Sequence, residues 1–184
     1  MTKASGGTRK KYPSAADARI TYAIKIRHRY DATTWDITMV DATSGGYVAT
    51  EIDRIRFSEK SSNEKRKYEK EKGMCIDLAH MGFQIEHLSE VSGISSSDVR
   101  IVRSPPGSII KINGEYADLK ALSSANNILR HGKDAIERQG AAKVVFKFSP
   151  AIDKSRMNSE INKLKNRNIH GIYYFEGSKG YEVF

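Results

Sequence analysis

The feature that constrains this chain most is the pair Asn113-Gly114, which directly precedes a run of alternating polarity. Asn-Gly is the strongest short signal for a tight turn between antiparallel strands. Residues 109–112 and 115–122 are therefore predicted to be two extended segments that pair across this turn. Because side chains of a strand alternate between faces, Asp118 and Lys120 are expected on the same side of the sheet.

Further carboxylates come from earlier extended runs. Asp98 begins one such run, and Glu86 lies on another, with Glu90 close behind it. Two carboxylates beside an ammonium on rigid strands can hold a hard divalent cation and a polarised water. The sequence therefore predicts a Mg²⁺ or Mn²⁺ site with Asp98 and Asp118 as ligands and Glu86 as a third candidate. Lys120 is expected to assist the water and to stabilise developing negative charge.

Helical and extended patterns alternate along the rest of the chain. Ser61-Ser62 is a helix start signal, and Gly82 is placed to end that helix. The predicted order from residue 62 is a helix over 62–81, strands over 83–88, 98–103, 109–112 and 115–122, a helix from 123 or 124 to about 138, a strand over 142–148, a helix beginning at Pro150, and strands over 169–175 and 181–184. This order predicts an α/β or α+β fold with a mixed central sheet flanked by helices.

The first 60 residues differ from the rest in pattern. Residues 1–13 are rich in Gly, Ser, Thr and Lys and are predicted to be a disordered arm. Residues 14–60 are predicted to form a small β-rich appendage, with extended segments at 20–26, 35–40 and 47–50. The main domain would then span residues 61–184. Basic residues just before Tyr30 either contact phosphates or only protect an exposed strand edge, and the sequence does not decide between these two roles.

Charge and composition point to the class of partner. The 184-residue chain has a formal net charge of +9, and the positive charge is spread along its length. Such a field favours a polyanion, and nucleic acid is the first candidate. No apolar run approaches the roughly 18 residues of a membrane span, and the first residues lack an apolar signal segment, so a cytoplasmic location is expected. The single cysteine, Cys75, cannot form an internal disulfide and is expected in the core.

A longer pattern surrounds the Asp-x-Lys block. It runs Asn113-Gly114-Glu115-Tyr116-Ala117-Asp118-Leu119-Lys120, then Asn126-Asn127, then Gln139-Gly140-Ala141-Ala142-Lys143-Val144-Val145. This pattern resembles the PD-(D/E)xK, or restriction-endonuclease-like, superfamily over roughly residues 64–150. More narrowly, it is similar to nuclease modules of bacterial polymorphic and contact-dependent growth inhibition toxins, and of phage and mobile-element proteins.

The resemblance implies a fold and a function. The fold would contain an αβββαβ core, and the activity would be metal-dependent hydrolysis of phosphodiester bonds in DNA or tRNA. It implies metal ligands at Asp98 and Asp118, a catalytic Lys120, and supporting roles for Glu86 and Gln139. A toxin of this kind would be delivered into a target cell and would have an immunity protein as partner.

Other residues extend or compete with this hypothesis. Arg130, His131 and Lys133 on the helix after the Asp-x-Lys strand are predicted to meet substrate phosphates. A metal-independent ribonuclease of the barnase/EndoU/colicin/RelE type would instead use His131 or His170 as acid and base, because histidine titrates near neutral pH. A third hypothesis is a non-catalytic accessory module that binds nucleic acid or protein. Dependence on divalent ions separates the first two hypotheses, and binding without cleavage would favour the third.

Overall fold

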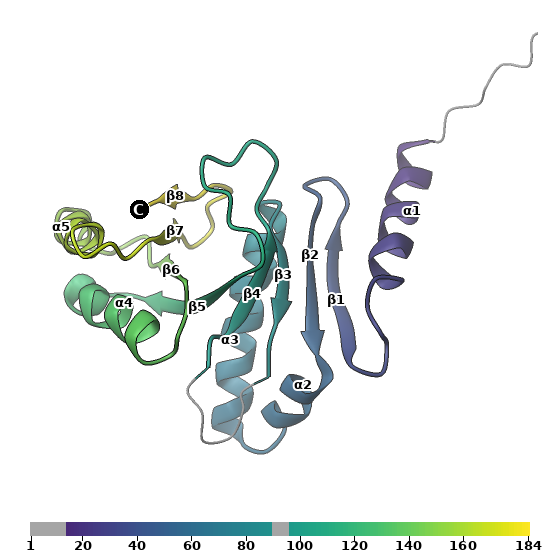
Figure 1. Ribbon diagram of the computed structural model, residues 1–184, viewed down its shortest axis with the longest axis horizontal. Coiled ribbons are helices and arrows are strands. Elements are labelled where there is room, and N and C mark those ends of the chain that lie inside the picture. The colour runs from purple at the N-terminus through teal and green to yellow at the C-terminus, as the bar shows by residue number, and fades with distance from the viewer. Residues whose placement is uncertain (1–13, 90–95) are drawn as a thin grey trace, which may run out of the picture.

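A single mixed sheet organises the computed structural model, which describes residues 14–89 and 96–184. Its eight strands lie side by side in chain order (Figure 1). They are β1 (Trp35–Asp41), β2 (Gly46–Glu51), β3 (Gln84–His87), β4 (Val99–Arg103), β5 (Glu115–Leu122), β6 (Lys143–Phe148), β7 (Gly171–Phe175) and β8 (Glu182–Val183). The pairs β2–β3, β5–β6 and β6–β7 are parallel, and the other four pairs are antiparallel. The predicted mixed sheet is confirmed.

Helices cover both faces of this sheet. The described α-helices are α1 (Ala15–Arg27), α2 (Ile52–Ser58), α3 (Ser62–His80), α4 (Ile128–Glu137) and α5 (Lys154–Lys165), and a short 3₁₀ helix, η1 (Ala125–Asn127), precedes α4. On one face, α3 packs its apolar side against the central strands, with Leu78 against Ile85 and Leu119 in one buried cluster. On the other face, α4 and α5 cover the C-terminal strands around Phe146 and Phe148.

The run α3, β3, β4, β5, α4, β6 reproduces the αβββαβ order expected from the sequence. The signals at the ends of α3 act as predicted. The Ser61 hydroxyl accepts a hydrogen bond from the backbone N–H of Glu64 at 3.1 Å, which satisfies one free donor of the first turn. Gly82 follows the helix with φ +94°, a conformation that favours glycine.

The extended segment predicted over residues 20–26 is wrong, because these residues belong to α1. Ser14 and Asp17 form a reciprocal capping box that starts the helix. The alternation of apolar residues that suggested a strand also contains a helical spacing of four. In α1 this spacing turns Tyr22 and Ile26 toward β2 and leaves Ile20 and Ile24 exposed.

The strand predicted over residues 109–112 is also wrong. β4 pairs directly with β5, and residues 104–114 form the connection between them. The Ser104 hydroxyl accepts from the Ile112 N–H at 2.8 Å and donates to the Ile112 carbonyl at 3.0 Å. The backbone of Ile112 is therefore satisfied without a strand partner. Gly114, at φ +76°, supplies the turn residue that the sequence predicts.

The structure also locates two boundaries that the sequence predicts. The helix predicted to begin at Pro150 begins at Lys154, because the Asp153 side chain caps it by accepting from the Arg156 N–H. The predicted division near residue 60 falls between α2 and α3, while β1 and β2 share one sheet with the later strands. The arm predicted over residues 1–13 lies outside the described residues.

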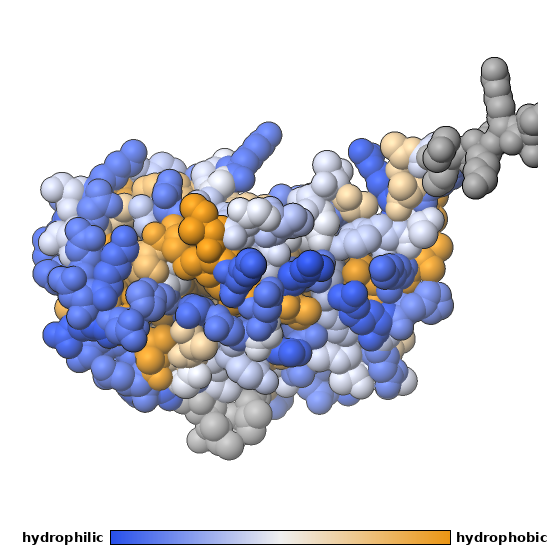
Figure 2. Space-filling model, turned by 45° about the horizontal axis from the view of Figure 1, so that its top comes forward, coloured by the Kyte–Doolittle hydropathy of each residue, from blue (hydrophilic) through white to orange (hydrophobic). Residues whose placement is uncertain are grey.

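The visible surface is largely hydrophilic, and one of its apolar patches lies at the α1 end of the molecule (Figure 2). Ile20 and Ile24 of α1 are 60% and 49% exposed. Within residues 14–89 and 96–184, no helix is both long and apolar enough to cross a membrane.

Candidate functional site

A buried carboxylate with two partners lies at the centre of the site. Asp118, on β5, is fully buried, and the Lys120 Nζ lies 2.6 Å from its Oδ2. The amide of Gln139 faces the same carboxylate. With its nitrogen turned inward, this amide donates to Oδ2 at 2.9 Å and also to Oδ1. Because a buried charge is costly unless it is paired, these contacts show that the chain holds Asp118 in place with dedicated donors.

The local structure explains why these three side chains meet. Asp118 pairs with Val144 of β6 in the middle of the sheet, and its neighbours on β5, Ala117 and Leu119, point into the α3 core. Strand alternation turns Asp118 and Lys120 to the opposite face, which α4 covers, so the two side chains share a face as predicted. Gln139 lies just beyond α4, where its N–H donates to the Asp134 carbonyl at 3.2 Å.

Asp98 joins this cluster from the end of β4. It is 7% exposed, and its Oδ2 accepts a hydrogen bond from the backbone N–H of Leu119 at 2.8 Å. Burial raises the pKa of the Asp98 carboxyl well above its usual range, and the nearby Asp118 and Glu71 carboxylates raise it further. Lys120 acts in the opposite direction. Asp98, Asp118 and Lys120 therefore form one electrostatic unit, as the sequence predicts.

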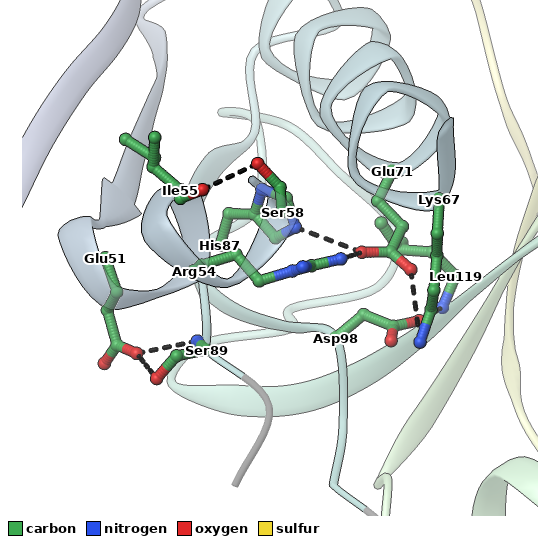
Figure 3. Close-up of polar contacts among 10 residues, drawn as sticks. All are labelled: Glu51, Arg54, Ile55, Ser58, Lys67, Glu71, His87, Ser89, Asp98 and Leu119. Atoms are coloured by element: carbon green, nitrogen blue, oxygen red, sulfur yellow. Dashed lines mark hydrogen bonds and ion pairs between the residues drawn. The ribbon is translucent and has the colours of Figure 1, made fainter. Parts of the chain in front are cut away.

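Glu71 is a residue that the sequence analysis did not select. It lies on α3, where its Oε2 is 2.7 Å from an Arg54 Nη2 and 3.3 Å from the His87 Nε2 (Figure 3). Burial alone would raise the pKa of Glu71, but hydrogen bonds from His87 and Arg54 outweigh burial and lower it. The sequence carries a signal for this position. Glu71 stands on the apolar stripe of α3, three residues after Tyr68 and four before Cys75, where a charge requires a partner.

Glu86 lies elsewhere on the sheet. Its Oε1 accepts from the Tyr30 hydroxyl at 3.0 Å, and its Oε2 accepts from Arg100 at 3.1 Å. Among the residues that the structure describes, no group of three or more His, Cys, Asp or Glu is placed to hold a metal ion. The structure thus does not gather Glu86 with Asp98 and Asp118, and Glu90 lies outside the described residues.

The two aspartates still match the needs of Mg²⁺. This ion is usually bound through one or two carboxylates, with waters and substrate phosphates completing its coordination. Asp98 and Asp118 supply two carboxylates in one buried cluster, beside a pocket that Lys120 and Gln139 line. The donor set therefore fits a divalent ion that is completed by substrate.

Two pockets border this cluster, the first through Lys120 and Gln139 and the second through Gln139. The first, of about 330 Å³, is lined by Lys120, His131, Asp134, Arg138 and Gln139. Gln139 also lines the second pocket, of about 540 Å³, which extends over Glu86 and Tyr116. Arg138 is a pocket residue that the sequence analysis did not select.

The three predicted phosphate-binding residues lie on α4, and of these His131 lines the first pocket while Arg130 and Lys133 do not. Burial followed by the charges of Arg130 and Lys120 lowers the pKa of His131. Arg130 is exposed, while the Lys133 Nζ lies 4.0 Å from Glu137. His170, the other predicted acid–base candidate, is 2.9 Å from the Asn168 Oδ1 and does not line this pocket.

Comparisons with known proteins add little to this geometry. No family model matches the chain, and no curated protein matches it. The chain is similar to a solved structure described as a CdiA-CT/CdiI toxin and immunity complex from Burkholderia pseudomallei. That match has a TM-score of 0.46 and 16% identity, and it covers 68% of this chain and 89% of the other.

Proposed function

We propose that this chain is a metal-dependent nuclease that hydrolyses phosphodiester bonds. The observation that carries the proposal is the fully buried Asp118 carboxylate, which Lys120 and Gln139 hold beside the buried Asp98. Burying two acidic groups side by side is unfavourable, and such arrangements concentrate at functional sites. The rigid strands β4 and β5 hold this arrangement in advance of substrate.

A Mg²⁺ or Mn²⁺ held by Asp98 and Asp118 would neutralise phosphate charge and make a bound water more acidic. In the hydrolysis, water forms a bond to phosphorus, the bond from phosphorus to the leaving oxygen breaks, and a proton ends on that oxygen. Lys120 orients the water and stabilises charge on the phosphate oxygens. Gln139 fixes the orientation of the Asp118 carboxylate through its two amide contacts.

Cations beside the cluster suit a polyanionic substrate. Arg138 lines the first pocket, and Arg130 is exposed and near enough to His131 for its charge to lower the pKa of that residue. With a net charge of +9 on the chain, these side chains attract and position the phosphates on either side of the bond that is cut.

One observation favours a second mechanism. His131 lines the first pocket, and its lowered pKa keeps the imidazole neutral and able to accept a proton near pH 7. In this alternative, His131 is the base of a metal-independent ribonuclease. His170 does not line the first pocket, so this alternative rests on His131.

The biological role proposed here is that of a toxin-like or mobile-element effector, with an immunity protein as partner in the toxin case. The support for this role is the sequence pattern around Asn113-Gly114, Asp118-x-Lys120 and Gln139. Delivery into a target cell belongs to the same proposal.

The test is cleavage of total tRNA and of plasmid DNA by purified protein in Mg²⁺, in Mn²⁺ and in EDTA. We expect cleavage with a divalent ion and none in EDTA. Cleavage that survives EDTA and is abolished by His131→Gln would establish the second mechanism in its place. Binding of nucleic acid without any cleavage under these conditions would support a non-catalytic module.

A further inference from the structure

A row of functional side chains crosses the sheet on the same side as Asp118. Glu86 of β3 pairs with Arg100 of β4, and Arg100 pairs with Tyr116 of β5. Directly paired residues share a face of a sheet, so these three side chains stand together. They line the second pocket, whose wall includes Trp35 of β1. The row lies between the part of the sheet packed by α1 and the part packed by α4.

We propose that this second pocket binds one unstacked nucleotide of a single-stranded substrate. The base of this nucleotide stacks on Tyr116, and N–H groups on the edge of the base donate hydrogen bonds to Glu86. The proposal rests on the proposed nuclease function and specifies the substrate class of the same site. It gives Glu86 a role in recognition in place of the metal-binding role that the sequence suggests.

Tyr116 is suited to stacking. Its side chain is 50% exposed, although it stands in the middle of the molecule on a central strand. A base can stack on such an exposed ring, and stacking accepts any base because each has a π-face. Trp35 reaches the same pocket from β1 and is held in position by Tyr30, with ring centroids 5.4 Å apart.

Glu86 is held as a fixed acceptor. The Tyr30 hydroxyl contacts both the Tyr47 hydroxyl at 2.8 Å and the Glu86 carboxylate at 3.0 Å. Burial, followed by the contact with Tyr47, raises the pKa of Tyr30, so its hydroxyl keeps the proton it donates. Each Glu86 oxygen accepts one hydrogen bond from the residues that the structure describes, and a carboxylate oxygen can accept more than one. Guanine presents two adjacent N–H donors and matches this carboxylate best.

The position of the pocket relates it to the cleavage site. Tyr116 and Asp118 are two residues apart on β5 and face the same way, which places their Cα atoms about 7 Å apart. Gln139 lines both pockets. A base on Tyr116 therefore belongs to a nucleotide beside the phosphate at Lys120. A base paired within a duplex remains in its stack and cannot enter a pocket of this kind, so the geometry selects single-stranded substrate.

The test measures binding without cleavage, by fluorescence anisotropy of labelled oligonucleotides in EDTA. The wild-type chain is compared with Tyr116→Ala, Tyr116→Phe and a surface control, Ile109→Ala, whose parent residue is 95% exposed. We expect single strands to bind more tightly than the same sequence as a duplex. Tyr116→Ala should weaken single-strand binding about 5- to 100-fold, while Tyr116→Phe and the control should not weaken it.

A second comparison tests the base edge. Oligonucleotides that differ only by guanine or inosine, which lacks the amino group, are bound to the wild-type chain and to Glu86→Gln. We expect the wild-type chain to prefer guanine and Glu86→Gln to lose that preference. Equal affinity of the wild-type chain for guanine and inosine would contradict the proposed role of Glu86. Unchanged binding by Tyr116→Ala would contradict the proposal that this pocket binds a nucleotide.

These outcomes separate the pocket from the nuclease proposal. Tight binding that depends on Tyr116, by a chain that never cleaves, would support the nucleotide-binding pocket and contradict the proposed nuclease activity. Metal-dependent cleavage would support the nuclease activity. If binding is then unchanged by Tyr116→Ala and equal for single strands and duplex, the proposed nucleotide pocket is contradicted.

Discussion

Asp98 binds the backbone N–H of Leu119 through its side chain, with 2.8 Å between Oδ2 and nitrogen. Leu119 stands between Asp118 and Lys120 on β5, so this one contact fixes the strand segment that carries both residues. The β4–β5 ladder ends at the Val99–Ala117 pair, and the Asp98 side chain continues the connection beyond that pair. Asp98 therefore has a structural role in addition to its proposed role as a metal ligand.

The first prediction separates these two roles. Asp98→Ala leaves the buried Leu119 N–H without its acceptor, which should cost about 1–3 kcal/mol of unfolding free energy. Asp98→Asn keeps an oxygen for that N–H, and we expect it to stay close to wild type in stability while losing activity. Urea unfolding followed by circular dichroism measures both variants. Equal stability of the two variants would contradict the structural role.

The second prediction concerns the Glu71 network on α3. Glu71→Gln removes the charge that faces the buried Arg54. Breaking a buried pair by removing one partner typically costs about 3–5 kcal/mol, and we expect a loss of this size in urea unfolding. Glu69→Gln, an exposed position on the same helix, is the matched control and should change stability little. A loss in the control as large as that in Glu71→Gln would refute the account.

The third prediction follows from the direction in which the fold shifts the pKa of Glu71. Its pKa in the folded chain lies below the ordinary value of 4.5, so ionised Glu71 stabilises the fold at pH values above 4.5. This contribution is lost as pH falls through the folded pKa. We therefore expect the stability difference between wild type and Glu71→Gln to be largest near neutral pH and to shrink in acid. A stability difference that grows below pH 4 would contradict a lowered pKa of Glu71 in the folded chain.

The fourth prediction uses two glycines in contrasting surroundings. A Cβ at Gly46 would lie 2.0 Å from the backbone oxygen of Ala79, so β2 and the end of α3 would have to separate. Gly46→Ala should cost about 1–3 kcal/mol or more. A Cβ at Gly73, inside α3, meets nothing within 4 Å, and Gly73→Ala should add about 0.5–1 kcal/mol. Thermal unfolding compares the two, and similar effects of both substitutions would be inconsistent with this packing.

The sequence predicted the elements whose signals are local. Ser61 and Gly82 bound α3 because capping and positive φ depend on the residue itself. The common face of Asp118 and Lys120 was predictable because strand side chains alternate, and the structure adds the ion pair between them. Residues 20–26 were assigned wrongly because their apolar spacing fits both periods, and only the packing of Ile26 on β2 decides between them.

The contacts that Glu71 and Glu86 make with distant segments were beyond reach of the sequence. Glu71 lies beside Asp98 because α3 packs against β3 and β4, and no local pattern encodes that proximity. Glu86 was grouped with the aspartates because all three are acidic residues on neighbouring strands. The register instead pairs it with Arg100, and α1 and its following turn place Tyr30 against it.

Lys120 is the residue proposed to act directly in phosphodiester cleavage, and Lys147 offers a matched control. Both are strand lysines paired with an aspartate, and their side chains are 22% and 20% exposed. The decisive measurement is the single-turnover cleavage rate of tRNA and DNA in Mg²⁺ for wild type, Lys120→Gln and Lys147→Gln, after circular dichroism confirms that each is folded. We predict a loss of about 100-fold or more for Lys120→Gln and a near wild-type rate for Lys147→Gln. A wild-type rate for folded Lys120→Gln would contradict the account.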